Sequence, residues 1–340
     1  MVTQKTISRN LDVSQAAVSY ALTGYRNGYN GGRISKEIRD DIIREASRLK
    51  YKPKNPPKKR KKQSIALLNS FGREGFWFPG LLKGIQDYAI ESSYLVTHHI
   101  FHVNDTLPEQ LISSVDGFIA VELPRPEELE RIAKHLPVVL LNINDSSEKY
   151  DSILPDHCNG IRKAVRHLHG LGHRKFGFFG VRDFPLHHAE RYGAYQQAVS
   201  ELSLPSPNPS WIFTPFRKES SMNDLEQKIK ETLSSLKKMK DRPTAMIFAA
   251  DAYALAFMRF AVDMGISIPK DISIVGFDDV NECESSMPSL SSIAQPLEKM
   301  GRLAAKYLIG RINGNNDPAV NVRVATEFKM RNSIAAPVNN

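Results

Sequence analysis

Four side chains near the amino terminus have the types and spacing that could contact DNA bases. Gln15, Ala16, Ser19 and Tyr20 project from one face of a short predicted helix within VTQKTISRNLDVSQAAVSYALTG, residues 2–24. A Gln amide can pair bidentately with adenine, and an Ala methyl can contact the thymine methyl. A recognition helix presents such side chains to the major groove from its first turns. The run therefore indicates DNA binding, and a generic helical hairpin is the alternative.

The neighbouring apolar residues predict the elements that would position these side chains. Ile7 would pack against Val18 and Leu22 in two short helices, with Ser14 capping the second and lying near the DNA. Residues 34–51 carry an apolar stripe typical of a third helix. We therefore expect residues 1–52 to form a small all-α domain containing a helix-turn-helix.

Basic residues are concentrated in the same part of the chain. Residues 1–62 contain 16 Lys and Arg against 5 Asp and Glu, whereas the remainder contains 30 against 32. Residues 53–63 form a basic, Pro-rich linker in which Lys58, Lys59 and Arg60 are predicted to contact the DNA backbone. A solvated tether is the alternative. This distribution of charge suits double-stranded DNA as a partner.

Beyond residue 64, short β-rich runs alternate with helical patterns. The expected strands are 64–69, 94–99, 117–121, 138–143, 175–180, 245–249 and 273–277. The expected helices include 79–91, 126–135, 160–171, 190–202, 223–238 and 252–264. This alternation predicts an α/β fold of open, parallel-sheet lobes, in which ligands bind at the carboxyl ends of the strands.

An ordered set of motifs resembles the LacI/GalR family of bacterial transcriptional repressors, whose core is similar to periplasmic sugar-binding proteins. In the amino-terminal region the motifs are VSQAAVSYALTG and ISKEIRDDIIREASRLKYKP. In the core they are VDGFI, HLHGLGHRKFGFFG, ERYGAYQQAV, GISIPKDISIVGFDD, SLSSIAQPLEKMG and ATEFKMRNS. They follow one another from residue 2 to about residue 333, so the resemblance covers nearly the whole chain.

The resemblance implies a domain organisation and a set of partners. The first core lobe would comprise 64–155 plus 291–320 and the second 156–290 plus 321–340, with residues 289–296 forming one crossing between them. A homodimer would bind a near-palindromic operator, and a small-molecule effector, expected to be a sugar, would change its DNA affinity.

The resemblance also assigns residues to the effector. Arg191 and Asp278 match the family's ligand-clamping arginine and carboxylate. The complete set of effector-binding candidates is Trp77, Phe78, Asp156, Arg191, Phe216, Asp251 and Asp278. For the three aromatic residues the alternative is core packing, and for Arg191 with Asp278 it is a structural ion pair, whose loss would destabilise the fold.

Two departures from the family pattern stand out. The family carries an Ala-Arg-x-Leu element that folds into a hinge helix, whereas residues 57–60 here are Pro-Lys-Lys-Arg, which predict no ordinary hinge helix. The family also commonly has Asn before Asp251, where this chain has Ala250. We therefore expect one polar effector contact to be missing.

Other chemistries find little support in the sequence. The histidines His167, His169, His173, His187 and His188 suggest a metal, but Gly170 and Gly172 end the predicted helix between the two that are four apart. Phosphate-loop, dinucleotide and nucleophile-elbow motifs are absent from the sequence, and Asp251, Asp278 and Asp279 lack a nucleophile or metal to partner them. We expect no cofactor, no metal and no enzymatic activity.

The cellular location follows from similar signals. The sequence carries no signal-peptide pattern and no apolar run of membrane-spanning length. We therefore expect a cytoplasmic protein in which Cys158 and Cys283 stay reduced, although a disulfide is an alternative. A solute-binding protein of a sugar transporter and, less strongly, a sugar-modifying enzyme are the alternative functions.

Overall fold

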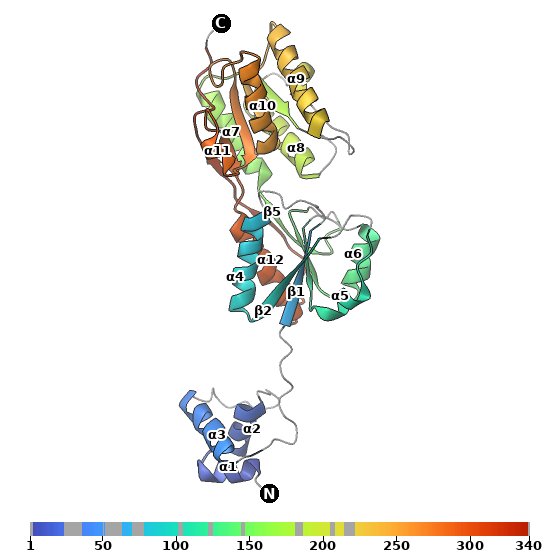
Figure 1. Ribbon diagram of the computed structural model, residues 1–340, viewed down its shortest axis with the longest axis vertical. Coiled ribbons are helices and arrows are strands. Elements are labelled where there is room, and N and C mark those ends of the chain that lie inside the picture. The colour runs from blue at the N-terminus through green and yellow to red at the C-terminus, as the bar shows by residue number, and fades with distance from the viewer. Residues whose placement is uncertain are drawn as a thin grey trace. The chain divides into compact units, whose positions relative to one another are not determined.

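The chain forms two compact units, residues 1–63 and 64–340, in a computed structural model (Figure 1). The residues described are 3–23, 36–49, 51, 63–69, 78–100, 105–121, 125–143, 147–180, 186–204, 208–213 and 222–338. Most of the predicted linker, residues 53–62, lies outside them.

The first unit contains the three expected helices: α1 (Gln4–Asn10), α2 (Gln15–Thr23) and α3 (Lys36–Arg48). Ile7, Val18 and Ile42, one from each helix, are fully buried together. The Ser14 hydroxyl accepts a hydrogen bond from the Ala17 N–H at 3.1 Å, as an N-cap residue does. The predicted helical hairpin and its cap are confirmed.

The first lobe of the second unit is a six-stranded sheet of order β11-β5-β4-β3-β1-β2. Its strands are β1 (Gln63–Asn69), β2 (Tyr94–Ile100), β3 (Phe118–Val121), β4 (Val138–Leu141), β5 (Asp151–Pro155) and β11 (Asn321–Val324). β11, β5, β4, β3 and β1 pair in parallel. Because side chains alternate along a strand, Ile65 and Leu67 face one layer of helices whereas Ala66 and Leu68 face the other.

Helices cover both faces of this sheet. α4 (Phe78–Glu91) and α12 (Leu297–Ile312) pack on one face, and α5 (Glu109–Ser114) and α6 (Pro126–Ala133) pack on the other (Figure 1). α4 and α12 approach closely at two glycines. A Cβ added to Gly84 would lie 2.0 Å from the Glu298 carbonyl oxygen, and one added to Gly301 would lie 2.1 Å from that of Leu81.

The second lobe repeats this plan with the sheet order β12-β10-β9-β8-β6-β7. Its strands are β6 (Phe176–Phe179), β7 (Ile212–Phe213), β8 (Ala245–Phe248), β9 (Ser273–Asp278), β10 (Ser291–Ala294) and β12 (Glu327–Lys329). β12 runs antiparallel to β10, and the other pairs are parallel. α7 (His157–Gly170) and α8 (Leu186–Glu201) cover one face, and α9 (Met222–Lys238) and α10 (Asp251–Asp263) cover the other.

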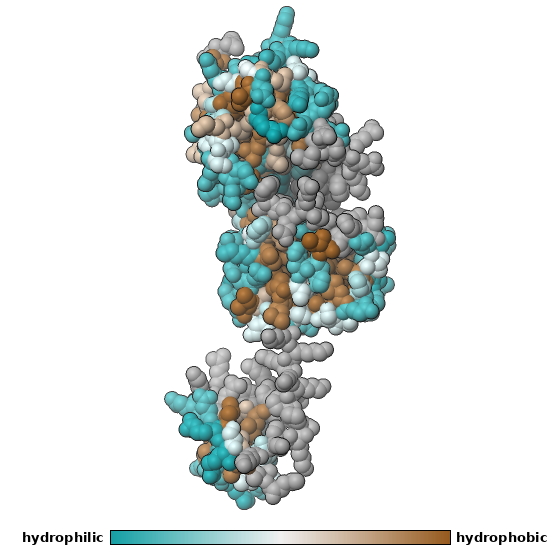
Figure 2. Space-filling view, in the orientation of Figure 1, coloured by the Kyte–Doolittle hydropathy of each residue, from teal (hydrophilic) through white to brown (hydrophobic). Residues whose placement is uncertain are grey.

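The predicted fold class is confirmed: a small helical domain precedes two α/β lobes built on mainly parallel sheets. Smaller elements are η1 (Pro209–Trp211) and α11 (Glu282–Ser285). On the side of the molecule that Figure 2 shows, hydrophilic and hydrophobic residues are interspersed among the coloured residues. Within the described ranges, no helix is both long and apolar enough to cross a membrane.

The predicted lobe boundaries were wrong at two short strands. Ser291–Ala294 forms β10, which pairs with β9 and so belongs to the second lobe. Asn321–Val324 forms β11, which pairs with β5 and so belongs to the first lobe. β10 lies between β12 and β9, whereas β11 is an edge strand. Sequence alone does not reveal either pairing, since backbone hydrogen bonds decide it. The segment that crosses between the lobes here is therefore Gln295 and Pro296, and not the whole of the expected range 289–296.

Candidate functional site

The structure brings Arg191 and Asp278 together in the second lobe. Arg191 lies on α8, is 2% exposed, and its Nη2 is 3.2 Å from Oδ1 of Asp278. Its Nε donates to Nδ1 of His157 at 3.3 Å, and its Nη1 donates to the Ala249 carbonyl oxygen. Its guanidinium carbon lies 3.7 Å from the centre of the Phe277 ring. A planar donor fork is thus held by directional bonds and by an aromatic face.

Asp278 ends β9, at the carboxyl edge of the sheet where open α/β folds bind ligands. Its φ is 122°, in the region that favours glycine, so its backbone is strained. Its Oδ1 accepts a hydrogen bond from Nε2 of Gln295 at 2.6 Å. Burial raises the pKa of this carboxyl to about 7, although Arg191 opposes the rise. Asp278 is therefore a strained carboxyl group whose ionisation carries a desolvation cost.

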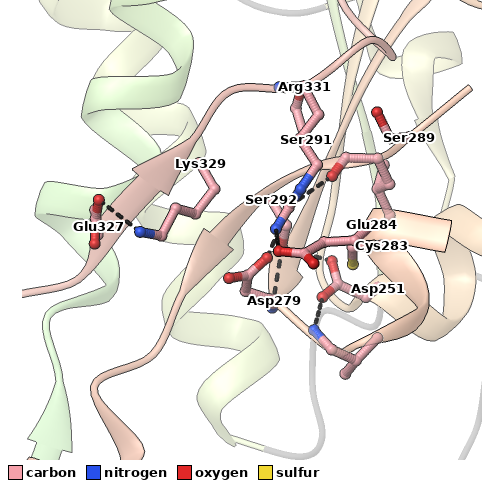
Figure 3. Close-up of polar contacts among 12 residues, drawn as sticks. Asp251, Asp279, Cys283, Glu284, Ser289, Ser291, Ser292, Glu327, Lys329 and Arg331 are labelled. Atoms are coloured by element: carbon pink, nitrogen blue, oxygen red, sulfur yellow. Dashed lines mark hydrogen bonds and ion pairs between the residues drawn. The ribbon is translucent and has the colours of Figure 1, made fainter. Parts of the chain in front are cut away.

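Asp251 begins α10 and holds the loop that follows β9. It is fully buried, its Oδ1 accepts from the Ser292 hydroxyl at 2.7 Å, and its Oδ2 accepts from the Val280 N–H at 3.0 Å (Figure 3). A Cβ on Gly276 would lie 2.0 Å from its Oδ1, which shows how closely β9 approaches it. The carboxylate thus ties the loop after β9 to β10, and a contact of Asp251 with an effector stays a prediction.

Arg331 was not recognised from the sequence, yet it fastens the same loop. Its Nη1 lies 2.7 Å from Oδ1 of Asp279, and its Nη2 lies 3.3 Å from Oε1 of Glu284 (Figure 3). Nη1 also donates to the Leu290 carbonyl oxygen, and the Arg331 N–H donates to the Ser291 hydroxyl. The residue lies far along the chain from Asp279, so no local spacing could have indicated the contact. Together with Asp251 it holds the loop that directly follows Asp278.

The other effector candidates differ in their surroundings. Phe78 is 1% exposed, packs in the core beneath α4, and its ring centre is 4.6 Å from that of His98. Core packing accounts for this burial, and a contact of the Phe78 ring with an effector stays a prediction. Oδ1 of the half-buried Asp156 accepts from the Asn159 N–H at 3.0 Å and so caps α7. Trp77 and Phe216 lie outside the described residues.

The candidates for DNA contact lie on or beside α2. Gln15 and Ala16 are exposed in its first turn, and Ser19 follows one turn later, half-buried. Ser14 uses its hydroxyl as the helix cap. The side chain of Tyr20 and the whole of Lys58, Lys59 and Arg60 lie outside the described residues. Two of the candidate side chains are thus exposed at the start of α2, and their contact with DNA stays a prediction.

Two of the histidines considered for a metal make structural contacts. His173 bonds through Nδ1 to the Thr244 hydroxyl at 2.9 Å and through Nε2 to the Ala335 carbonyl oxygen at 2.8 Å. His167 packs against the ring of Phe328. In the part of the chain that the structure describes, no group of three His, Cys, Asp or Glu side chains could hold a metal ion. Cys158 and Cys283 are both free thiols.

Comparison with known proteins defines the family. The family model for the periplasmic binding protein-like domain matches residues 165–334. The ribose operon repressor of Haemophilus influenzae is 28% identical and aligns over 93% of this chain and 94% of its own length. Catabolite control protein A of Priestia megaterium is 24% identical, over 98% of this chain and 99% of its own. The chain belongs to the LacI/GalR family of transcriptional regulators.

Solved structures of LacI-type regulators share the fold. The complex of the transcriptional regulator CelR with cellobiose has a TM-score of 0.69 and 21% identity, and covers 98% of this chain and 100% of its own. An Enterococcus faecium LacI family regulator with bound ribose has a TM-score of 0.66 and 24% identity, and covers 81% of this chain and 99% of its own. These relatives are regulators, so neither the solute-binding protein nor the enzyme gains support.

Proposed function

We propose that this LacI/GalR regulator binds operator DNA through α2 and that a sugar-type effector held by Arg191 and Asp278 changes its DNA affinity. The observation that carries the proposal is the contact between these two residues, which lie 87 positions apart and meet at the carboxyl edge of a parallel sheet. Open α/β sheets bind ligands at this edge.

The chemistry of the pair suits a polyhydroxylated ligand. A guanidinium has five N–H donors and no acceptor, whereas an ionised carboxylate only accepts. Arg191 uses three donor atoms on His157, Ala249 and Asp278, so its two remaining N–H groups can donate to a ligand. Vicinal hydroxyls both donate and accept, and they match a site that offers both functions. The ribose and cellobiose held by structural relatives are molecules of this class.

The DNA-binding part of the proposal rests on α2 and on charge. Gln15 and Ala16 are exposed at the start of a capped helix, where a recognition helix contacts base edges. The excess of Lys and Arg in residues 1–62 would neutralise phosphates on either side of the groove. The target is double-stranded DNA, which places the protein in the cytoplasm.

We further propose a homodimer on a near-palindromic operator, because two-fold protein symmetry matches two half-sites. Ile90 on α4 and Leu95 and Ile100 on β2 are 73%, 49% and 52% exposed, respectively. α4 and β2 are consecutive elements of one lobe edge, so these apolar side chains offer a surface that a second copy could cover. Light scattering measures the mass directly, and a monomer at micromolar concentration would contradict this part.

The effector site is tested with a sugar panel that includes ribose and cellobiose. Alanine variants are poor probes, because truncating one member of a buried ion pair costs about 3–5 kcal/mol of stability. Arg191→Lys and Asp278→Asn keep a polar group of similar size, and should lose less stability than the alanine variants while losing at least tenfold in sugar affinity. Arg302→Gln breaks the exposed Arg302–Glu91 ion pair between α12 and α4 and serves as the control.

Two outcomes would count against the site. Conservative variants that bind the sugar as tightly as the wild type would show that Arg191 and Asp278 form only a structural pair. Arg302→Gln losing affinity to the same degree would show that the loss is not specific to the pair.

A further inference from the structure

An ion pair next to the candidate effector arginine joins the two lobes. Glu190 precedes Arg191 on α8 of the second lobe, whereas Arg323 lies on β11 of the first-lobe sheet. Arg323 Nη1 is 3.1 Å from Oε2 of Glu190, and Nη2 is 3.4 Å from its Oε1, so the contact is two-pronged. Residues 325 and 326 then lead directly into β12 of the second lobe. The pair therefore fastens one lobe to the other beside a crossing.

His157 lies between this ion pair and Arg191. It begins α7 just after β5 and is fully buried. Its Nδ1 accepts from Nε of Arg191 at 3.3 Å, and its Nε2 is 3.6 Å from Oε2 of Glu190. Because Nδ1 is the acceptor, the ring proton belongs on Nε2, which faces the carboxylate. Burial, with Arg191 and Arg323 nearby, holds the pKa of His157 well below its usual value, so the ring stays neutral.

We propose that His157 is a positioning residue that couples the effector arginine to the Glu190–Arg323 ion pair, so that occupancy of Arg191 governs how firmly the two lobes are fastened. The coupling rests on the proposed effector site. A ligand that takes up donors of Arg191 shifts the guanidinium relative to His157. The ring then shifts relative to Glu190, and the ion pair strengthens or opens.

The exposures of the residues suit this role. Arg191 and His157 are almost completely buried, so a small displacement at one is passed on to the other by packing. The side chains of Arg323 and Glu190 are 37% and 21% exposed, and partly exposed ion pairs contribute little net stability. The contact between Arg191 and His157 is thus rigid, whereas the Glu190–Arg323 ion pair can break and reform.

The buried step is tested by nuclear magnetic resonance without any ligand. In nitrogen-labelled protein, the ring nitrogens of His157 are assigned by the signals that disappear in His157→Phe. We expect the neutral tautomer protonated at Nε2, with both signals shifted in Glu190→Gln. The tautomer protonated at Nδ1 could not accept from Arg191 and would overturn the proposal.

The coupling is tested by spin labels that report the distance between the lobes. Glu127→Cys on α6 and Asp263→Cys on α10 are both exposed, and Cys158→Ser removes the accessible thiol while Cys283 is buried. Diluting labelled with unlabelled protein suppresses distances between copies. We expect Arg323→Gln and His157→Phe to broaden the distance distribution, and Arg302→Gln, within one lobe, to leave it unchanged.

The decisive comparison measures the effect of Arg191→Lys on the distance distribution in the wild type and in Arg323→Gln. Arg191→Lys should broaden the distribution in the wild type but add nothing in Arg323→Gln, because the pair it acts through is already broken. Equal effects of Arg191→Lys in both backgrounds would overturn the proposal. Arg323→Gln removes a partly exposed contact and keeps the test available if His157→Phe does not fold. These measurements need no sugar, so they test the coupling even if the effector assignment is wrong.

Discussion

The close approach of α4 and α12 offers a quantitative test of helix packing in the first lobe. Gly301→Ala on α12 would place a Cβ 2.1 Å from the Leu81 carbonyl oxygen and 3.0 Å from the Ile85 nitrogen, both backbone atoms of α4. An ordinary contact needs about 3.4 Å or more, so the helices must separate by roughly 1 Å. Overpacking of this kind costs about 1–3 kcal/mol, and a clash with backbone belongs at the upper end.

Helix propensity opposes the clash, because Ala is favoured over Gly in a helix by about 1 kcal/mol. The net loss for Gly301→Ala is therefore about 2 kcal/mol, which lowers Tm by roughly 4–8 °C in a domain of this size. Gly310→Ala on the same helix is the matched control, since a Cβ there meets nothing within 4 Å. It should keep or raise Tm.

Thermal unfolding followed by circular dichroism compares the two variants with the wild type. If Gly301→Ala melted together with Gly310→Ala, the close approach of α4 and α12 would be refuted. Since α12 begins directly after Pro296, we also expect Gly301→Ala to weaken the response of DNA binding to sugar.

Three further predictions concern DNA and pH. Gln15→Ala should cost about 1–3 kcal/mol on the cognate operator and relax discrimination at one base pair, and an equal loss on all sequences in a binding titration would contradict this docking. Replacing residues 58–62 by Gln should weaken specific and nonspecific DNA alike and flatten the salt slope by up to about 0.9 per lost phosphate contact, whereas lost specificity at an unchanged slope would indicate a folded hinge. Because the pKa of Asp278 is raised to about 7 in the folded protein, its contribution to stability is present below about pH 4 and is lost as pH rises through about 7. Urea unfolding should therefore show a smaller loss of stability between pH 5 and 7 in Asp278→Asn than in the wild type, and equal losses would show that Asp278 titrates normally.

Local patterns in the sequence determined much of this protein. The spacing of Ile7 and Val18 and the hydroxyl of Ser14 were sufficient for the helical hairpin, because a short helix and its cap depend on residues three or four apart. Continuous apolar runs such as 118–121 and 245–248 marked buried parallel strands for a similar reason. Ordered motifs then identified the family, and they placed Arg191 and Asp278 in one site before any contact was known.

Only the tertiary structure decided which lobe the short strands join and what the buried polar groups do. β10 and β11 carry no strong apolar signal. β10 pairs with β9, the strand that precedes it, whereas β11 pairs with β5, which lies far earlier in the chain. Asp251 was recognised as a polar residue at a strand end, but its direction depends on Ser292, which the fold brings to it. No pattern in the sequence singled out His157, because its proposed role arises where α7, α8 and β11 meet. A sequence records the periodicity of each element, whereas a buried carboxylate or imidazole takes its function from partners that only folding supplies.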